Sequence, residues 1–164
     1  MKRVATKFII VFWLVLLAGC GFHLRGEATL PESLKTMYLQ GVNTEQGFGL
    51  ELKRTLKRNG INVIPDYEKG AVILTILQNR FDRRVLSVGS NAKVSEYELD
   101  GVVEYKVTDG QGKVLSPPQT LEAQRSYEFD QNQVLAMGEQ ESLLREQMYQ
   151  QIIQNILRRL SVLK

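Results

Sequence analysis

The sequence predicts a single α+β domain, a two-layer sandwich in which two helices pack on one face of a mostly antiparallel or mixed four-stranded sheet. Strict alternation of polar and apolar residues from Tyr97 to Val107 indicates a strand with one buried face. Apolar residues recur every four positions in the stretches 45–59 and 130–160, as they do in amphipathic helices. The order of strand, helix, several strands and final helix is typical of an α+β sandwich.

The segment before residue 20 reads as a bacterial lipoprotein signal peptide. Three basic residues precede an uncharged apolar run from Phe8 to Ala18, which is the arrangement of a secretory signal. That run is shorter than the roughly 20 apolar residues that a membrane-spanning helix needs. The sequence Leu17-Ala18-Gly19-Cys20 resembles the lipobox, which predicts cleavage before Cys20 and acylation of its sulfur and new amino terminus. An ordinary cleaved signal, the alternative, would leave a free thiol in an oxidising compartment.

Gly21 bears on the destination of the acylated chain. In lipoproteins of this type an aspartate directly after the cysteine retains the protein at the inner membrane, and this chain has Gly21 there. The lipobox resemblance therefore implies transfer to the inner leaflet of the outer membrane. The predicted organisation is a signal peptide at 1–19, an acylated anchor and lead segment at 20–35, and a single domain at 36–164.

The charge balance changes once the signal peptide is removed. Three of the 21 Lys and Arg residues and none of the 18 Asp and Glu residues precede Cys20, so the mature chain carries 18 of each sign. The basic pI therefore gives no argument for nucleic acid. Since Cys20 is the only cysteine, no disulfide can stabilise the fold, which must depend on one hydrophobic core.

The first half of the domain predicts a strand, a helix and two further strands. Residues 36–40 alternate as a half-buried strand does. The helix at 45–59 ends at Asn59-Gly60 and has a basic face that is either solvated or in contact with anionic headgroups. A brief strand is expected at 61–64. Residues 71–78 are apolar on both faces, which predicts an interior strand covered on both sides.

The second half predicts an antiparallel meander followed by a long helix. Residues 79–93 are expected to hold the end of a strand, a turn and the start of the next strand. Asp109 to Gly112 signals a hairpin, and Pro117-Pro118 forces an edge or a bulge before a strand at 121–129. The final helix would be roughly 40 Å long. Its possible caps are Asp130 to Asn132, and its apolar stripe comprises Leu144, Met148, Ile152, Ile156 and Leu160.

The chain carries no recognisable catalytic machinery. Its single histidine, His23, lies three residues from the acylated cysteine and is expected to act as a spacer. No Cys/His metal spacing, serine nucleophile motif or phosphate-binding glycine loop occurs, so neither an enzyme nor a cofactor is predicted. Glu96, Glu98 and Asp100 lie on the outer parity of their strand and predict a wet or partner-facing surface.

Motifs spread along the mature chain carry a family resemblance. The most specific is the opening Cys20-Gly21-Phe22-His23-Leu24-Arg25-Gly26. Later motifs are Ser95-Glu96-Tyr97, Arg125-Ser126-Tyr127, Leu144-Arg145-x-Gln147-Met148 and Ile156-Leu157-Arg158-Arg159-Leu160. Together they resemble the lipopolysaccharide-assembly lipoproteins of the LptE (RlpB) family over essentially the whole mature chain.

This resemblance implies an outer-membrane lipoprotein that sits inside the β-barrel LptD, assists its assembly and helps deliver lipopolysaccharide to the outer leaflet. The turn from Gly89 to Lys93 would then point up into the barrel. A porin-like lumen is polar, so a plug needs polar outer faces, which the parity of Glu96 and Glu104 would offer. The alternative function is a free-standing periplasmic carrier, which would have to enclose acyl chains in an apolar cavity.

The resemblance also marks positions for lipopolysaccharide contact. Family members carry basic residues in the turn and at the start of the last helix, where this chain has Ser90 and Met137. Lys93, Arg83 and Arg84 lie near the turn and are the candidate phosphate contacts instead. A fourth cation, Arg125, lies on the apolar parity of its strand and is expected to be buried and paired.

Overall fold

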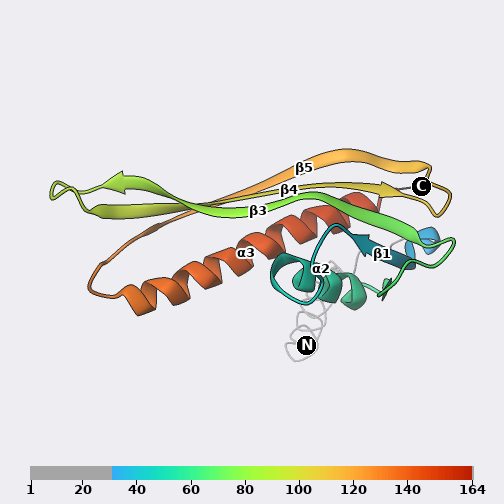
Figure 1. The fold of residues 1–164 in the computed structure, drawn as a ribbon, viewed down its shortest axis with the longest axis horizontal. Coiled ribbons are helices and arrows are strands. Elements are labelled where there is room, and N and C mark those ends of the chain that lie inside the picture. Colours follow the sequence, from blue (N-terminus) through green and yellow to red (C-terminus); the bar gives the residue numbers. More distant parts are fainter. Residues whose placement is uncertain (1–30, 164) are drawn as a thin grey trace, which may run out of the picture.

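A computed structural model describes residues 31–163, so the predicted signal peptide, Cys20 and His23 lie outside the described residues. The elements follow in the order η1 (Glu32–Leu34), β1 (Thr36–Gln40), α2 (Gly47–Arg58), β2 (Asn62–Ile64), β3 (Val72–Val88), β4 (Val94–Thr108), β5 (Val114–Glu128) and α3 (Val134–Leu160). Both long helices lie on the same side of the sheet (Figure 1), which confirms the α+β two-layer prediction.

The sheet has five strands in the order β2-β1-β3-β4-β5, one more than predicted. The brief strand expected at 61–64 is present as β2 and pairs in parallel with β1, so the sheet exceeds the predicted four strands. β1 also pairs in parallel with β3, whereas β3, β4 and β5 form the expected antiparallel meander.

The core fills the space between the inner face of the sheet and the two helices. Strand β4 contributes Leu99, Val103 and Tyr105, each 1% exposed or less. The apolar stripe of α3 faces them, and four of its five predicted members are fully buried, Leu144 being half-buried. In the part of the chain that the structure describes, no helix is long and apolar enough to cross a membrane.

Strand β3 runs from the apolar stretch predicted at 71–78 on to Val88, so it ends within 79–93, where the end of a strand was expected. A bulge at Leu77 explains why its pattern is hard to read, because Ile76 faces Tyr105 and Gln78 already faces Glu104. One extra residue reverses which side chains point inward. The expected cover on both faces is also wrong, since Leu77 is 45% exposed.

Only the first part of β3 has a neighbour on each side. β1 pairs with β3 from Val72 to Thr75, so residues 77–88 form a free edge, bordered by β4 alone. The hairpin of β3 and β4 reaches far beyond α2, and its turn, Gly89 to Lys93, lies at one extremity of the molecule (Figure 1). We call this extremity the distal end; η1 and the C-terminus lie near the other.

The sequence predicted that Pro117 and Pro118 lie either in an edge strand or in a bulge, and the structure shows both. They lie in β5, which is an edge strand of the sheet. They also lie in a bulge, because Tyr105 faces Gln119 while Val107 faces Ser116. Proline is tolerated at such positions because no ladder hydrogen bond is lost.

The last helix begins at Val134, later than the predicted start. Asp130 organises the turn that precedes it, accepting hydrogen bonds from the backbone N–H of Asn132 at 2.8 Å and from the Gln133 side chain at 2.9 Å. The predicted capping segment therefore forms a separate turn.

Candidate functional site

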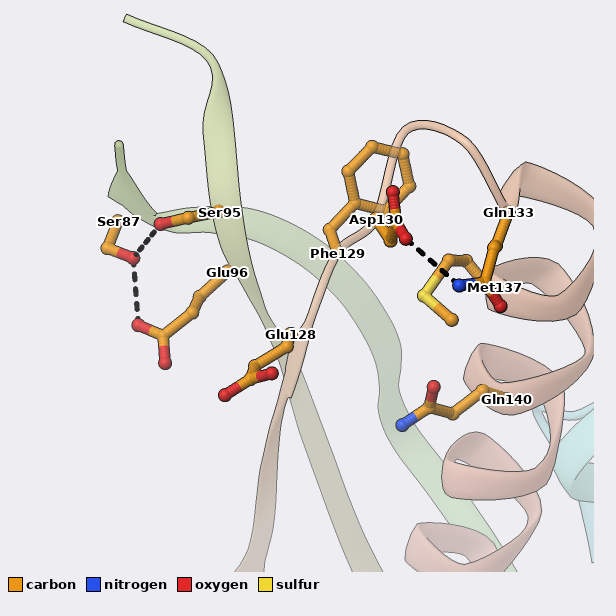
Figure 2. Close-up of a pocket in the computed structure, with 9 residues that line it drawn as sticks. All are labelled: Ser87, Ser95, Glu96, Glu128, Phe129, Asp130, Gln133, Met137 and Gln140. Atoms are coloured by element: carbon orange, nitrogen blue, oxygen red, sulfur yellow. Dashed lines mark hydrogen bonds between the residues drawn. The ribbon is translucent and has the colours of Figure 1, made fainter. Parts of the chain in front are cut away.

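Two adjoining hollows at the distal end hold the positions that the sequence marked. The first has a volume of about 690 Å³ and opens between the strand ends and the first turns of α3 (Figure 2). The second, of about 440 Å³, lies under the β3–β4 turn. They share Ser95, Phe129 and Asp130. Met137 lines the first hollow and Ser90 the second, so the fold places both positions at the same end.

The first hollow is acidic. Glu96 and Glu128 face each other directly across β4 and β5, and Figure 2 shows both carboxylates on the side of the hollow. The backbone N–H of Asn132 and the Gln133 amide lower the pKa of Asp130 by hydrogen-bonding to its carboxylate. The lining of the first hollow includes no lysine or arginine, so this hollow does not suit a phosphate.

Lys93 is the cation of the second hollow. Its side chain is exposed at the end of the turn, and its backbone N–H donates to Asn91 Oδ1 at 3.1 Å. No ion pair of Lys93 occurs within residues 31–163. Its charge is therefore available at the distal surface.

Arg83 lies apart from Lys93, on the inner side of β3 under α3. Its guanidinium donates to Glu141 at 2.8 Å and lies 4.5 Å from the centroid of the Tyr97 ring. Glu141 also accepts hydrogen bonds from Tyr127 at 2.8 Å and from Arg145 at 3.0 Å. These contacts tie α3 to β3 and β5, so Arg83 has a structural role in this cluster.

The cluster of Arg83, Tyr127, Glu141 and Arg145 shifts the pKa values of Tyr127 and Glu141. Burial raises the pKa of Tyr127, and its hydrogen bond to Glu141 adds to the effect. For Glu141 burial acts in the same direction, but hydrogen bonds from Tyr127, Arg145 and Arg83 outweigh it and lower the pKa of its carboxyl below the ordinary 4.5. The stabilisation from the Glu141 carboxylate is therefore present above about pH 4.5 and is lost as the pH falls through the lowered folded-state pKa.

We expect Glu141→Gln to lower the free energy of unfolding by about 1–2 kcal/mol at pH 7, a modest cost because Arg83 is half-exposed. The difference from the wild type should shrink as the pH falls from about 4.5 through the lowered folded-state pKa of Glu141, because the unfolded chain takes up the proton first. Urea unfolding at several pH values measures both effects. Glu139→Gln, at an exposed position of the same helix, is the control and should stay within about 0.5 kcal/mol. A pH-independent difference would contradict the assignment.

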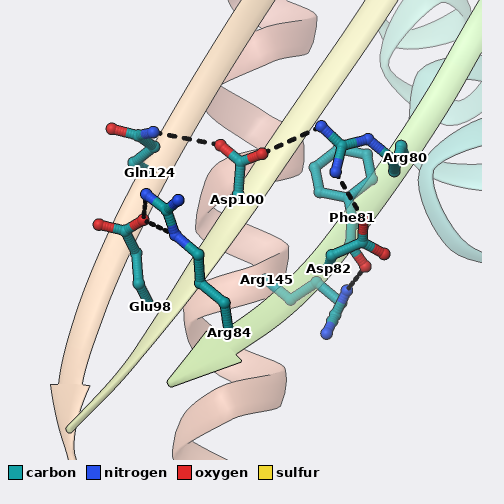
Figure 3. Close-up of polar contacts among 8 residues, drawn as sticks. All are labelled: Arg80, Phe81, Asp82, Arg84, Glu98, Asp100, Gln124 and Arg145. Atoms are coloured by element: carbon teal, nitrogen blue, oxygen red, sulfur yellow. Dashed lines mark hydrogen bonds and ion pairs between the residues drawn. The ribbon is translucent and has the colours of Figure 1, made fainter. Parts of the chain in front are cut away.

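Arg84 points to the opposite, outer face of the sheet (Figure 3). Its Nε donates to Glu98 at 2.6 Å. Arg80 bonds to Asp82 at 2.7 Å and to Asp100 at 3.2 Å, so charges of both signs cover this face. The polar outer parity of β4 is confirmed. Lys93, Arg83 and Arg84 therefore lie in three different environments and do not form one phosphate site.

Arg125 differs from its prediction. It is half-buried, and it donates to the Gln151 side chain at 2.6 Å and to the backbone oxygen of Gln124 at 2.7 Å, so its partners are amides rather than a carboxylate. Sequence reasoning missed Glu141, and it quoted Arg145 and Tyr127 only within family motifs, without a role. The spacing of Glu141 and Arg145 by one helical turn is the signal that could have suggested their ion pair.

The basic face of α2 is engaged locally. Lys53 pairs with Glu45 at 2.8 Å and Arg54 with Glu51 at 3.0 Å, as expected for a solvated helix face. Among residues 31–163 no group of three or more His, Cys, Asp or Glu side chains could hold a metal ion.

Comparisons with known proteins agree with this fold. A family model described as LptE, lipopolysaccharide-assembly, matches residues 34–160. The LPS-assembly lipoprotein LptE of Photorhabdus laumondii subsp. laumondii is 23% identical over 160 residues, covering 98% of this chain and 87% of that protein. The protein of the same name from Pectobacterium atrosepticum is 26% identical over 161 residues, covering 93% and 84%.

Solved structures are similar as well. A minor lipoprotein from Acinetobacter baumannii has a TM-score of 0.65 and 28% identity, covering 80% of this chain and 93% of that one. The solution structure of an uncharacterized lipoprotein B from Nitrosomonas europaea has a TM-score of 0.69 and 28% identity, covering 86% and 90%.

Proposed function

This chain belongs to the LptE family of lipopolysaccharide-assembly lipoproteins, a non-enzymatic family, and from that premise we propose that it is a subunit of the lipopolysaccharide translocon of the outer membrane. In this role it is anchored through acylated Cys20 to the inner leaflet of the outer membrane. It plugs the lumen of the LptD β-barrel, assists assembly of that barrel and helps insert lipopolysaccharide into the outer leaflet.

The observation that carries this proposal is a filled core beneath polar outer faces. The space between sheet and helices is occupied by side chains such as Tyr105, Met148 and Ile156, each at most 1% exposed. The outer face of the sheet carries the ion pairs of Arg80 and Arg84 with acidic partners (Figure 3). Such a body suits the polar lumen of a barrel. A carrier would need an enclosed apolar chamber where this core lies.

The elongated shape also supports the plug. The described chain begins beside η1, at the end of the molecule opposite the β3–β4 turn (Figure 1). An anchor attached at this end would hold it near the periplasmic mouth of the barrel. The distal end, with Lys93, would then reach into the lumen.

A pull-down of the tagged chain that recovers the LptD barrel tests the proposed plug function. We expect that outer membranes extracted in mild detergent, with this chain pulled down through a C-terminal tag, yield a large heat-modifiable β-barrel in equal molar amount. An unrelated tagged outer-membrane lipoprotein is the control for carry-over. Recovery of this chain alone with bound lipid would overturn the plug and favour the carrier.

Lys93 is the proposed phosphate contact, because Arg83 and Arg84 already have carboxylate partners. We expect Lys93→Ala to weaken the binding of purified lipopolysaccharide by roughly fivefold, the loss of one exposed charge-assisted bond. Lys113→Ala is a matched control, since Lys113 closes the corresponding β4–β5 turn at the other end of the molecule. Equal losses in the two variants would show a nonspecific charge effect and overturn the contact.

A further inference from the structure

The free edge of β3, residues 77–88, is a long strand edge that the fold leaves open. Uncovered strand edges present rows of backbone N–H and C=O groups that can pair with another chain. Beyond the β3–β4 ladder, no backbone hydrogen bond is made by these residues within the described part of the chain. Apart from the Phe81 carbonyl, which accepts a hydrogen bond from Arg145, their outward groups are therefore available to a partner.

One side-chain contact identifies which groups point outward. Arg145, on α3, donates to the carbonyl oxygen of Phe81 at 2.8 Å, so that carbonyl points away from β4. Alternate residues of an antiparallel strand present their backbone groups on opposite sides. Arg83 and Val85 therefore turn both N–H and C=O to the free edge. The pairing of β4 with β5 agrees with this assignment. The Phe129 N–H donates to the Ser95 carbonyl, so the odd-numbered residues of β4 turn their backbone groups toward β5 and away from β3.

The open part of the edge has defined limits. Arg145 occupies the Phe81 carbonyl on one side, and a second bulge between Val85 and Ser87 interrupts the strand on the other. Val85, 51% exposed, lies at the end of this open part, and the exposed apolar side chains Leu86 and Val88 follow it at 47% and 62%.

The opposite edge of the sheet offers less to a partner. Its strand, β5, contains Pro117 and Pro118, which lack backbone donors. Arg125 occupies the outward carbonyl of Gln124. Its distal half carries no exposed large apolar side chain.

We propose that the free edge of β3 is a docking edge at which an extended segment of the partner β-barrel adds as a further strand, centred on Arg83 and Val85. This inference rests on the proposed function, which supplies the barrel. Strand addition matches the paired donors and acceptors of the edge, and an apolar residue of the incoming segment can contact Val85. A lipid phosphate does not fit, because Arg80 and Arg84 on this strand already bond to Asp100 and Glu98.

Residue-resolved hydrogen exchange tests the docking edge. The full-length chain is compared alone in detergent and in the complex purified from outer membranes. The amides of Arg83 and Val85 should exchange at least roughly tenfold more slowly in the complex, whereas the Arg84 amide, which faces β4, should change little. Unchanged exchange in a complex that contains the barrel overturns the docking edge and leaves the plug standing. Absence of the barrel overturns both.

A pair of variants at one position provides a second test. Val85→Pro removes the outward N–H without removing a bond to β4, whereas Val85→Ala keeps that N–H. We expect the proline variant to recover roughly fivefold less barrel in the pull-down than the alanine variant. Equal recovery by two folded variants contradicts the proposal. If the proline variant does not fold, the exchange experiment decides.

Discussion

Cys20→Ala is expected to abolish acylation and to remove the chain's membrane anchor. In the proposed role the acyl chains are the source of that anchor, each contributing about 0.8 kcal/mol per buried methylene, and stable anchoring takes more than one chain. Within residues 31–163 no helix is long and apolar enough to span a membrane. Incorporation of labelled palmitate and the intact mass of the purified protein measure the effect, and we expect complete loss of the label.

Gly21→Asp is the matched control for this experiment. It leaves Cys20 in place, so we expect full acylation together with retention at the inner membrane. Among the described residues the core is built from 34–160, and we expect both variants to unfold at the wild-type temperature. Palmitate on the alanine variant would refute the assignment of Cys20 as the acylated residue. A fully acylated aspartate variant in the outer membrane would refute only the sorting rule.

A strand could be predicted from the sequence where its residues alternate regularly between buried and more exposed positions. From Leu99 to Val107 every second residue is buried, so the period of two is visible in the sequence. β3 could not be traced in the same way. The Leu77 bulge reverses its parity, and beyond it the strand is an edge whose Arg and Asp side chains resemble a loop.

The candidate site was predictable in location but not in arrangement. Motif positions placed Ser90, Lys93 and Met137 at one end, and the structure brings their hollows together. Arg83 and Arg84 were treated as equivalent because the sequence did not show where within 79–93 the first strand ends. Neighbouring residues of a strand point to opposite faces, which separates the Glu141 cluster from the outer ion pairs. The carboxylate partners come from distant segments, and no local pattern identifies them.

Gly41→Ala is expected to lower the free energy of unfolding by about 3 kcal/mol. Gly41 follows β1 at the point where that strand parts from β3, and its φ of +79° is one that residues with a side chain rarely adopt. A Cβ there would lie 2.2 Å from the carbonyl oxygen of Ile76, the residue before the Leu77 bulge. Backbone cannot rotate away as a side chain can, so β1 and β3 would have to separate. Urea unfolding of the purified chain measures the loss.

Gly60→Ala separates the two causes of that loss. Gly60 has nearly the same φ, +80°, but its Cβ would meet no atom within 4 Å. Its variant should therefore show only the conformational cost of about 1 kcal/mol. The difference of about 2 kcal/mol between the variants then measures the close approach of β1 to β3. Equal losses would mean that the backbone relaxes at Gly41, and that the end of β1 is not fixed by contact with Ile76.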